Sequence, residues 1–293
     1  MKNDLLKLNI GEVKEIKLSD YSTYRVGGKS TMVYVDSINS LIKLLKYLNT
    51  NEVKHKVIGN ASNLIFSDSG YNGVLINLSK ISYIRKYKNY FTVSSGYSLI
   101  KFSNEISNMG YIGLEFATGI PGQIGGAVFM NAGCYGSDIS KVLYKAKVLT
   151  SDYKVKTIYN KDLKFDYRDS ILRYKDYILL TATFKLEKGN IEEIKTKIEE
   201  YRLKRYNSQP LEYPNAGSVF RNPEGFSAGK LIDDLGLKGT SIGGAYVSYK
   251  HANFIINKEN ATSKDIISLI NLIERKIKEE YNLDLECEQE IVE

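Results

Sequence analysis

The chain has 293 residues, of which 43% are hydrophobic and 26% charged, so we expect a globular protein of about two domains. Two cysteines and two histidines argue against a disulfide framework, a structural zinc site and any chemistry that needs several imidazoles. The basic residues that give the net charge of +7 are spread among acidic neighbours, which favours small anionic ligands such as nucleotides over a nucleic acid.

No part of the sequence resembles a membrane anchor. No stretch approaches the roughly 18 consecutive apolar residues of a membrane-spanning helix. The N-terminal MKNDLLKLNIGEVKEIK contains no apolar core followed by a cleavage site, so we expect no signal peptide. A cytosolic protein is therefore expected.

Apolar residues that recur every three or four positions predict four helices. These helices are expected over residues 37–49, 97–109, 190–206 and 263–281. Thr262 and Asp265 stand where a capping box would begin the last of them. Short β-rich runs lie between and after the helices. They are 31–35, 54–59, 73–78, 89–96, 144–150, 177–186, 217–220 and 253–257. Helices and strands mixed in this way predict an α+β fold, and the two prolines of NSQPLEYPNAG mark a boundary after residue 206.

Three segments are rich in glycine: YRVGGKS (24–30), GNASNLIFSDSGYNG (59–73) and GLEFATGIPGQIGGAVFMNAGCYG (113–136). Glycine exposes backbone N–H groups that can converge on a phosphate, although neither GxGxxG after a first strand nor GxxxxGK[ST] is present. Tight turns are the alternative interpretation. The third segment carries a single charge, Glu115, so we expect it to be buried against a ligand or the core.

Eight motifs together resemble the UDP-N-acetylenolpyruvoylglucosamine reductase family, in the family's order and over nearly the whole chain. They are STYRVGG (22–28), GNASNLI (59–65), the third glycine-rich segment, FDYRDS (165–170), NAGSVFRNP (215–223), AGKLIDDLGLKG (228–239), GGAYVSYKHANFIIN (243–257) and LECEQE (285–290). The combination GIPGxxGGAxxMNAG with a later GSVFxNP is highly specific.

The resemblance implies a domain organisation. An FAD-binding region of the vanillyl-alcohol-oxidase (PCMH) type would span residues 1–190, in subdomains of about 1–80 and 81–190. A helix and linker would cover 191–212, and a smaller α+β substrate-binding domain would cover 213–293. The last strand is expected to return to the active site.

The resemblance also implies an activity in peptidoglycan precursor synthesis. NADPH would reduce FAD, and reduced FAD would reduce UDP-N-acetylglucosamine enolpyruvate to UDP-N-acetylmuramate. The expected partner is a small UDP-sugar, with no nucleic acid, no membrane and a monomeric chain. Two alternatives stay open: another flavin-dependent oxidase or dehydrogenase of the same fold, and a non-catalytic basic nucleotide- or RNA-binding protein.

The residues that the resemblance implies for FAD binding lie in the second and third glycine-rich segments. They are Gly59, Asn60, Ala61, Ser62, Asn63, Gly119, Ile120, Gly122, Ile124, Gly125 and Gly126. The family more commonly reads G-G-G-S-N-L in the second segment, so Asn60 and Ala61 stand here in place of two glycines.

Ser218 matches the family's proton donor. A serine hydroxyl is a weak acid, and it can protonate only a strongly basic carbanion such as the one this reaction forms. The alternative is a serine that bonds to local backbone. A hydrolase nucleophile is less attractive, because no G-x-S-x-G elbow is present.

Arg168 and Glu288 match the family's other catalytic residues. The guanidinium of Arg168 would bind a carboxylate and stabilise an enolate, or it would form a surface ion pair with Asp166 or Asp169. In LDLECEQEI a strand would place acidic side chains on one face, which is usual for a solvated edge. Glu288 is the expected catalytic carboxylate there, with Glu286 or Glu290 taking its place if the C-terminal alignment shifts.

Four further residues are implied for substrate binding: Asn222, Lys230, Lys250 and His251. Each could instead be an ordinary exposed polar residue. Arg168 and Ser218 are 218 − 168 = 50 positions apart, which resembles the compact form of the family that lacks an extra loop with a substrate-clamping tyrosine.

Overall fold

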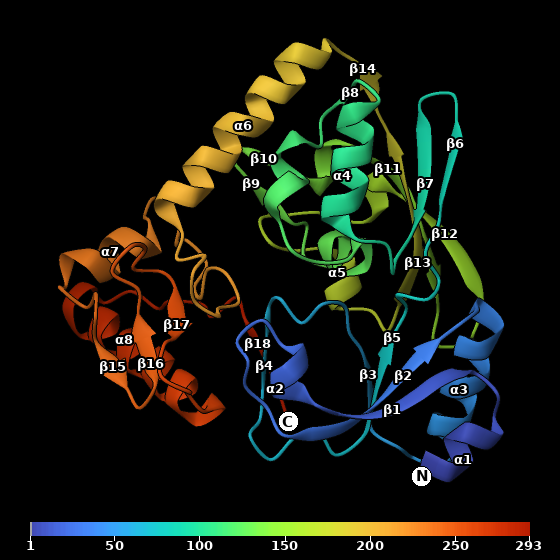
Figure 1. The fold of residues 1–293 in the computed structure, drawn as a ribbon, viewed down its shortest axis with the longest axis horizontal. Coiled ribbons are helices and arrows are strands. Elements are labelled where there is room, and N and C mark those ends of the chain that lie inside the picture. The colour runs from blue at the N-terminus through green and yellow to red at the C-terminus, as the bar shows by residue number, and fades with distance from the viewer. Residues whose placement is uncertain (1) are drawn as a thin grey trace. The chain divides into compact units, whose positions relative to one another are not determined.

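The structure is a computed structural model that describes residues 2–293 (Figure 1). The chain forms two compact units, each assembled from separate segments. Unit 1 consists of residues 2–14, Met32–Gly59 and Val74–Lys204, and unit 2 of Glu15–Thr31, Asn60–Gly73 and Arg205–Glu293. The segments Glu15–Thr31 and Asn60–Gly73 thus belong to the same unit as the last third of the chain. The functional domains 1–190 and 213–293 stay a prediction.

A four-stranded sheet with the order β1-β2-β5-β3 begins the fold. Its strands are β1 (Gly11–Lys17), β2 (Lys29–Val35), β3 (His55–Val57) and β5 (Val74–Asn77). The helices of this region are α1 (Lys2–Lys7) and α3 (Ile38–Thr50). Four leucines of α3 are buried in one apolar cluster with β2 and β5, because the apolar stripe of the helix faces the sheet.

The second sheet of unit 1 has five antiparallel strands in the order β12-β11-β13-β7-β6. They are β6 (Ile84–Tyr87), β7 (Tyr90–Ser94), β11 (Leu143–Leu149), β12 (Val155–Tyr159) and β13 (Ile178–Lys185). Helices α4 (Leu99–Asn108) and α5 (Ile124–Phe129) pack against it in a single core (Figure 1). Phe102 of α4 lies 5.0 Å, centroid to centroid, from Phe184 of β13.

Short elements complete unit 1. They are the pairs β8 (Tyr111–Ile112) with β14 (Glu187–Lys188) and β9 (Gly133–Cys134) with β10 (Ser137–Asp138), and the 3-10 turns Glu115–Gly119, Ile139–Lys141, Asn160–Asp162 and Ile171–Arg173. The long helix α6 (Ile191–Ser208) runs from unit 1 into unit 2.

Unit 2 has a core of its own, in which α8 (Ser263–Tyr281) packs on the antiparallel strands β15 (Ser241–Ile242), β16 (Ala245–Val247) and β17 (Ile255–Asn257). Helices α2 (Leu18–Tyr21) and α7 (Ala228–Asp234) belong to the same unit. The last strand, β18 (Glu290–Val292), pairs in parallel with β4 (Leu64–Phe66). Thr262 and Asp265 form the expected capping box at the start of α8.

The structure confirms all four predicted helices, which begin and end within two residues of the expected positions. The predicted strand 217–220 is wrong. That run is irregular apart from one antiparallel bridge between Phe220 and Cys287. Other hydrogen bonds join it to Asn253 and to the side chain of Gln289, and no strand in the described part of the chain pairs with it. The strand expected in LDLECEQEI is limited to β18. Within residues 2–293, no helix is long and apolar enough to cross a membrane.

Candidate functional site

The first glycine-rich segment is shaped by packing within unit 2. A Cβ atom on Gly28 would lie 2.6 Å from the backbone nitrogen of Gly70 and 2.8 Å from the carbonyl carbon of Ser69. A Cβ atom on Gly27 would lie 2.7 Å from the Cβ of Phe66. Both glycines are therefore explained by the close approach of the chain to residues 66–70, without a ligand.

The third glycine-rich segment is held against β7 and α4 in unit 1. The backbone N–H of Ile124 donates to the carbonyl of Tyr97 at 2.9 Å, and that of Gly125 donates to Ser95 at 2.8 Å. The carbonyl of Gly122 accepts from Leu99 at 3.0 Å. Ile124 itself is fully buried, as expected for a segment that packs on the core. These bonds fix the first turn of α5.

Gly126, the third residue of α5, has no such explanation within the protein. It is exposed, and a Cβ atom built on it would have no atom within 4 Å. A glycine within a helix lowers stability by about 0.5–1 kcal/mol relative to alanine. Because an alanine would fit here without a clash, the glycine needs a reason other than packing within the protein. Nearby in unit 1, a Cβ on Gly59 would lie 3.5 Å from Oε1 of Gln123, the residue that precedes α5. The start of the second segment therefore meets the middle of the third just before α5.

Gly119 and Ile120 lead into this region. Gly119 ends the 3-10 turn Glu115–Gly119, and the N–H of Ile120 donates to the carbonyl of Ala117 at 3.2 Å. Ile120 is half-buried against the core of unit 1.

Residues 60–63 belong to unit 2. Ala61 is buried and has a φ of +53°, in the left-handed region that favours glycine, which is the residue the family more commonly has there. Asn60 is exposed and Ser62 half-buried. The side-chain amide of Asn63 donates to the carbonyl of Glu288 at 2.9 Å, so this segment is tied to the C-terminal segment.

Arg168 lies in a tight hairpin of unit 1 that is closed by backbone bonds between Asp166 and Asp169. Its φ is +55°, and its Nη2 donates to the carbonyl of Gly133 at 2.6 Å, so the guanidinium is attached to the third glycine-rich segment. Asp169 forms an ion pair with Arg173, with 3.6 Å between the charged atoms. The half-buried Arg168 thus places a positive charge beside the glycine-rich backbone.

Ser218 lies in an irregular loop of unit 2 and is half-buried. Among residues 2–293, the Ser218 hydroxyl has no hydrogen-bond partner. The alternative of a serine that bonds to local backbone is therefore not observed. Gly217, which precedes it, has a φ of +78° and turns the chain at this point.

Glu288 lies on the segment beside Ser218. The N–H of Glu288 donates to the carbonyl of Val219 at 2.7 Å, and that of Arg221 donates to Glu286 at 2.9 Å. Glu288 is half-buried, whereas Glu286 and Glu290 are exposed. The structure therefore brings the segments of two predicted catalytic residues together within unit 2.

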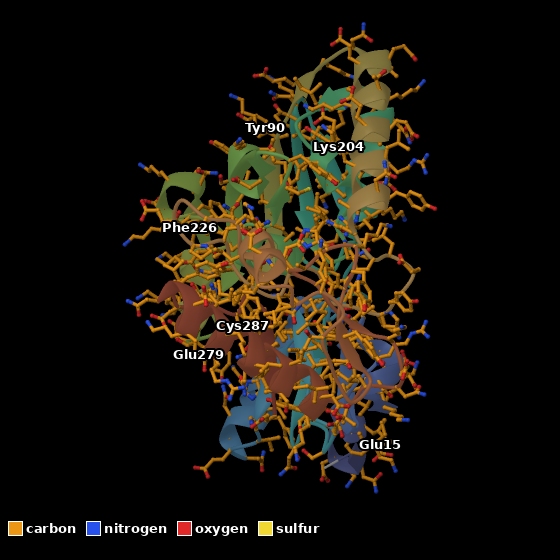
Figure 2. All side chains as sticks on the ribbon, turned by 90° about the vertical axis from the view of Figure 1, so that its left-hand side faces the viewer. Glu15, Tyr90, Lys204, Phe226, Glu279 and Cys287 are labelled. Carbon is orange, nitrogen blue, oxygen red and sulfur yellow. The ribbon has the colours of Figure 1, made fainter. Side chains whose placement is uncertain are left out.

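Leu285 of the C-terminal segment is buried in unit 2, and Cys287 packs partly buried against the same core. Burial raises the pKa of the Cys287 thiol to about 11, and Cys287 is labelled in Figure 2. Gln289 is also buried, and its side chain bonds with Tyr24 and with the loop that carries Ser218. Sequence reasoning did not assign Gln289 a role, because its partner Tyr24 lies 265 positions away.

The four predicted substrate-binding residues are all in unit 2. The side-chain oxygen of Asn222 accepts from the N–H of Ala228 at 3.0 Å and so closes the loop before α7, where Phe226 is exposed (Figure 2). Exposed Lys230 pairs with Asp234 at 2.9 Å, and this pairing raises the pKa of the lysine.

Lys250 and His251 lie in the turn between β16 and β17. The ammonium of Lys250 is exposed and lies 5.1 Å from the centroid of the Tyr206 ring. The Nδ1 of His251 accepts from the N–H of Asn253 at 3.2 Å, and its ring lies against Phe254. Burial, together with the positive charge of Lys238, lowers the pKa of His251.

Comparisons with known proteins agree over the whole chain. Residues 30–159 match the model of an FAD binding domain, and residues 209–292 match that of the UDP-N-acetylenolpyruvoylglucosamine reductase C-terminal domain. The UDP-N-acetylenolpyruvoylglucosamine reductase of Clostridium botulinum is 42% identical over 94% of this chain and 91% of its own length. That of Bacillus pumilus is 39% identical over 100% of this chain and 98% of its own.

A solved structure extends the agreement to the fold. The crystal structure of UDP-N-acetylenolpyruvylglucosamine reductase from Thermus caldophilus is 34% identical, covers 96% of this chain and 99% of its own, and superposes with a TM-score of 0.83. These findings confirm the expected α+β fold with an FAD-binding region followed by the family's C-terminal domain. The chain belongs to the UDP-N-acetylenolpyruvoylglucosamine reductase family and carries its FAD-binding domain.

Proposed function

We propose that the chain reduces UDP-N-acetylglucosamine enolpyruvate to UDP-N-acetylmuramate, with NADPH as the source of the hydride, in peptidoglycan precursor synthesis. The reaction consumes NADPH, one proton and the enolpyruvyl sugar, and it yields NADP⁺ and the lactyl ether. FAD, which the glycine-rich backbone would hold, would supply the hydride-transfer chemistry that links NADPH to the enolpyruvyl double bond. Membership of the family and the matched FAD binding domain support this reaction.

The protein's own contribution begins with holding the cofactor. Gly125 and Gly126 in α5 and Gly59 beside Gln123 present backbone with little side-chain bulk, which suits a planar ring system. Residues 60–63, with the left-handed turn at Ala61, present N–H groups and a hydroxyl suited to a pyrophosphate. Neither group of residues contains a side chain of fixed negative charge, so each suits its own part of FAD.

The chemical step creates negative charge on the substrate. Addition of a hydride to the terminal carbon of the enolpyruvyl group moves electrons towards its carboxylate, and the adjacent carbon then needs a proton. Arg168 binds the carboxylate and stabilises the charge that develops on it. Ser218 donates the proton, and Glu288 assists this transfer or polarises the intermediate. Asn222, Lys230, Lys250 and His251 bind the polar groups of the UDP-sugar.

One observation carries the proposal: the Ser218 hydroxyl has no hydrogen-bond partner within residues 2–293, although the adjacent segment carries Glu288. A hydroxyl used only for local structure would bond to a neighbouring carbonyl. A hydroxyl that bonds to a ligand would have no partner within the ligand-free protein.

The test is anaerobic stopped-flow of the two half-reactions, followed by flavin absorbance. Ser218→Ala should reduce FAD with NADPH at nearly the wild-type rate, and its reoxidation by the enolpyruvyl sugar should slow by about 10²–10⁴-fold, the range for loss of a general acid. Ser241→Ala, an exposed serine of β15, is the control and should leave both rates unchanged. Equal slowing of both half-reactions by Ser218→Ala would refute the assignment. Rapid reoxidation of the wild type by oxygen, without the sugar, would favour an oxidase.

A further inference from the structure

Gln289 is a buried amide in the core of unit 2, with 5% of its surface exposed. Its Oε1 accepts a hydrogen bond from the hydroxyl of Tyr24 at 3.0 Å. Its Nε2 faces three consecutive carbonyl oxygens, at 3.2 Å from Ala216, 3.4 Å from Gly217 and 3.3 Å from Ser218. The amide therefore bonds to the backbone of the loop that carries the proposed proton donor.

The orientation of this amide is set by its surroundings. If the amide were flipped, Oε1 would face three carbonyl oxygens, and all four atoms carry partial negative charge. Tyr24 is fully buried, and burial raises the pKa of its phenol, which keeps the hydroxyl protonated as a donor. Tyr24 therefore holds Oε1, and the N–H groups of Gln289 must point at the loop.

The loop needs such support because regular structure does not hold it. Residues 216–219 form no strand, and Gly217 is in a conformation that other residues rarely adopt. After Ser218 the loop is held by backbone bonds from Val219 to Asn253 at 2.9 Å and from Glu288 to Val219 at 2.7 Å. At and before Ser218, the carbonyl groups are held by Gln289.

We propose that Gln289, oriented by Tyr24, is a positioning residue that fixes the direction of the Ser218 hydroxyl. This inference rests on the proposed role of Ser218 as the proton donor. Gln289 does not touch the substrate in this scheme. It acts by restricting the backbone of residues 216–218, and a displacement of about 1 Å at a catalytic group can cost about 10²-fold in rate.

The test uses the flavin-loaded full chain and the variant Tyr24→Phe/Gln289→Leu, which removes both partners of the buried bond. Removing both avoids leaving the buried Tyr24 hydroxyl unpaired, and it takes from the carbonyls of residues 216–218 the donor whose role is tested. We expect reduction of FAD by NADPH to be unchanged and reoxidation by the enolpyruvyl sugar to slow about 10- to 100-fold. Because Gln289 does not bind the sugar, kcat should fall while KM stays the same.

Two further measurements separate positioning from a general loss of stability. Amide hydrogen exchange of the flavin-free protein should become faster in residues 216–220 of the variant and stay unchanged in β16, which lies in the same unit. Addition of Ser218→Ala to the variant should slow reoxidation no further than Ser218→Ala alone, because a misplaced donor and a missing donor are equivalent.

The outcomes distinguish the two proposals. Multiplicative slowing in the combined variant, or unchanged exchange in residues 216–220, would overturn the role of Gln289 and leave that of Ser218 intact. If Ser218→Ala alone slows both half-reactions equally, the proton-donor assignment itself fails. Selective slowing, faster loop exchange and a combined variant that matches Ser218→Ala would support both.

Discussion

Gly126→Ala should stabilise the flavin-free protein and weaken FAD binding. The new methyl group would have no protein atom within 4 Å, so it creates no clash. Alanine in place of a helical glycine lowers the entropy of the unfolded chain and contributes about 0.5–1 kcal/mol. For a chain of this size, that corresponds to a rise of about 1–3 °C in the melting temperature.

The flavin-loaded protein should respond in the opposite way. If FAD packs on the backbone of α5 at Gly126, the methyl group overlaps with it, and overpacking typically costs about 1–3 kcal/mol. That cost corresponds to a loss of about 5- to 150-fold in affinity. Circular dichroism of the flavin-stripped protein gives the melting temperature, and titration with FAD, followed by the quenching of its fluorescence, gives Kd.

The matched control lies one position away on the same helix. A Cβ on Gly125 would lie 3.3 Å from the Cβ and the carbonyl oxygen of Ser95, which is tighter than ordinary contact. Gly125→Ala should therefore bring no gain in the melting temperature of the flavin-free protein. Two results for Gly126→Ala would refute the reasoning: an unchanged Kd for FAD, which would show that α5 does not face the cofactor at this position, or a lower melting temperature.

Two further predictions concern the packing and titration of unit 2. Gly28→Ala should destabilise the flavin-free protein by about 1–3 kcal/mol in urea unfolding, because its methyl group would lie 2.6 Å from the backbone nitrogen of Gly70; an unchanged midpoint would contradict this account of the first glycine-rich segment. The pKa of the Cys287 thiol is about 11 in the folded protein, against 9.0 for an unperturbed cysteine. The contribution of the buried neutral thiol to the free energy of unfolding is therefore fully present below pH 9 and is lost as the pH rises to about 11. The stability of wild type relative to Cys287→Ala should fall by up to about 3 kcal/mol over that interval, and a constant difference would exclude a buried thiol.

The helices could be predicted from the sequence because an apolar stripe is a local property. In α8 the buried isoleucines recur at helical spacing, and Thr262 and Asp265 mark the first turn. The buried face of the helix and its first residue can therefore both be predicted from local sequence. The run 217–220 gave a false strand signal, because two apolar residues after a glycine fit a strand or a buried loop equally well. Val219 and Phe220 are buried by Asn253 and by residues 286–288, and these contacts are not local in sequence.

The candidate site was predicted by resemblance, but the reason for each glycine was not. Composition alone cannot separate Gly28, whose missing side chain makes room for backbone, from Gly126, whose missing side chain faces open space. No local pattern of the sequence indicates a role for Gln289. Its burial follows the alternation of the C-terminal segment, and its partner Tyr24 reaches it through the tertiary fold alone.

The sequence left two interpretations of Ser218, a structural hydroxyl or a proton donor, and the surrounding bonds support our proposal of the second. A structural serine satisfies its own hydroxyl, as Ser22 does with the carbonyl of Val26 at 2.9 Å. At Ser218 the opposite holds: its carbonyl is bonded to a buried amide, while its hydroxyl has no partner within residues 2–293. Removing the polar groups of Gln289 and Tyr24 from water costs free energy. Apolar side chains could pack against a loop of purely structural function without that cost. The fold instead fixes the backbone on both sides of a hydroxyl and leaves that hydroxyl available, which is the arrangement a directed proton transfer requires.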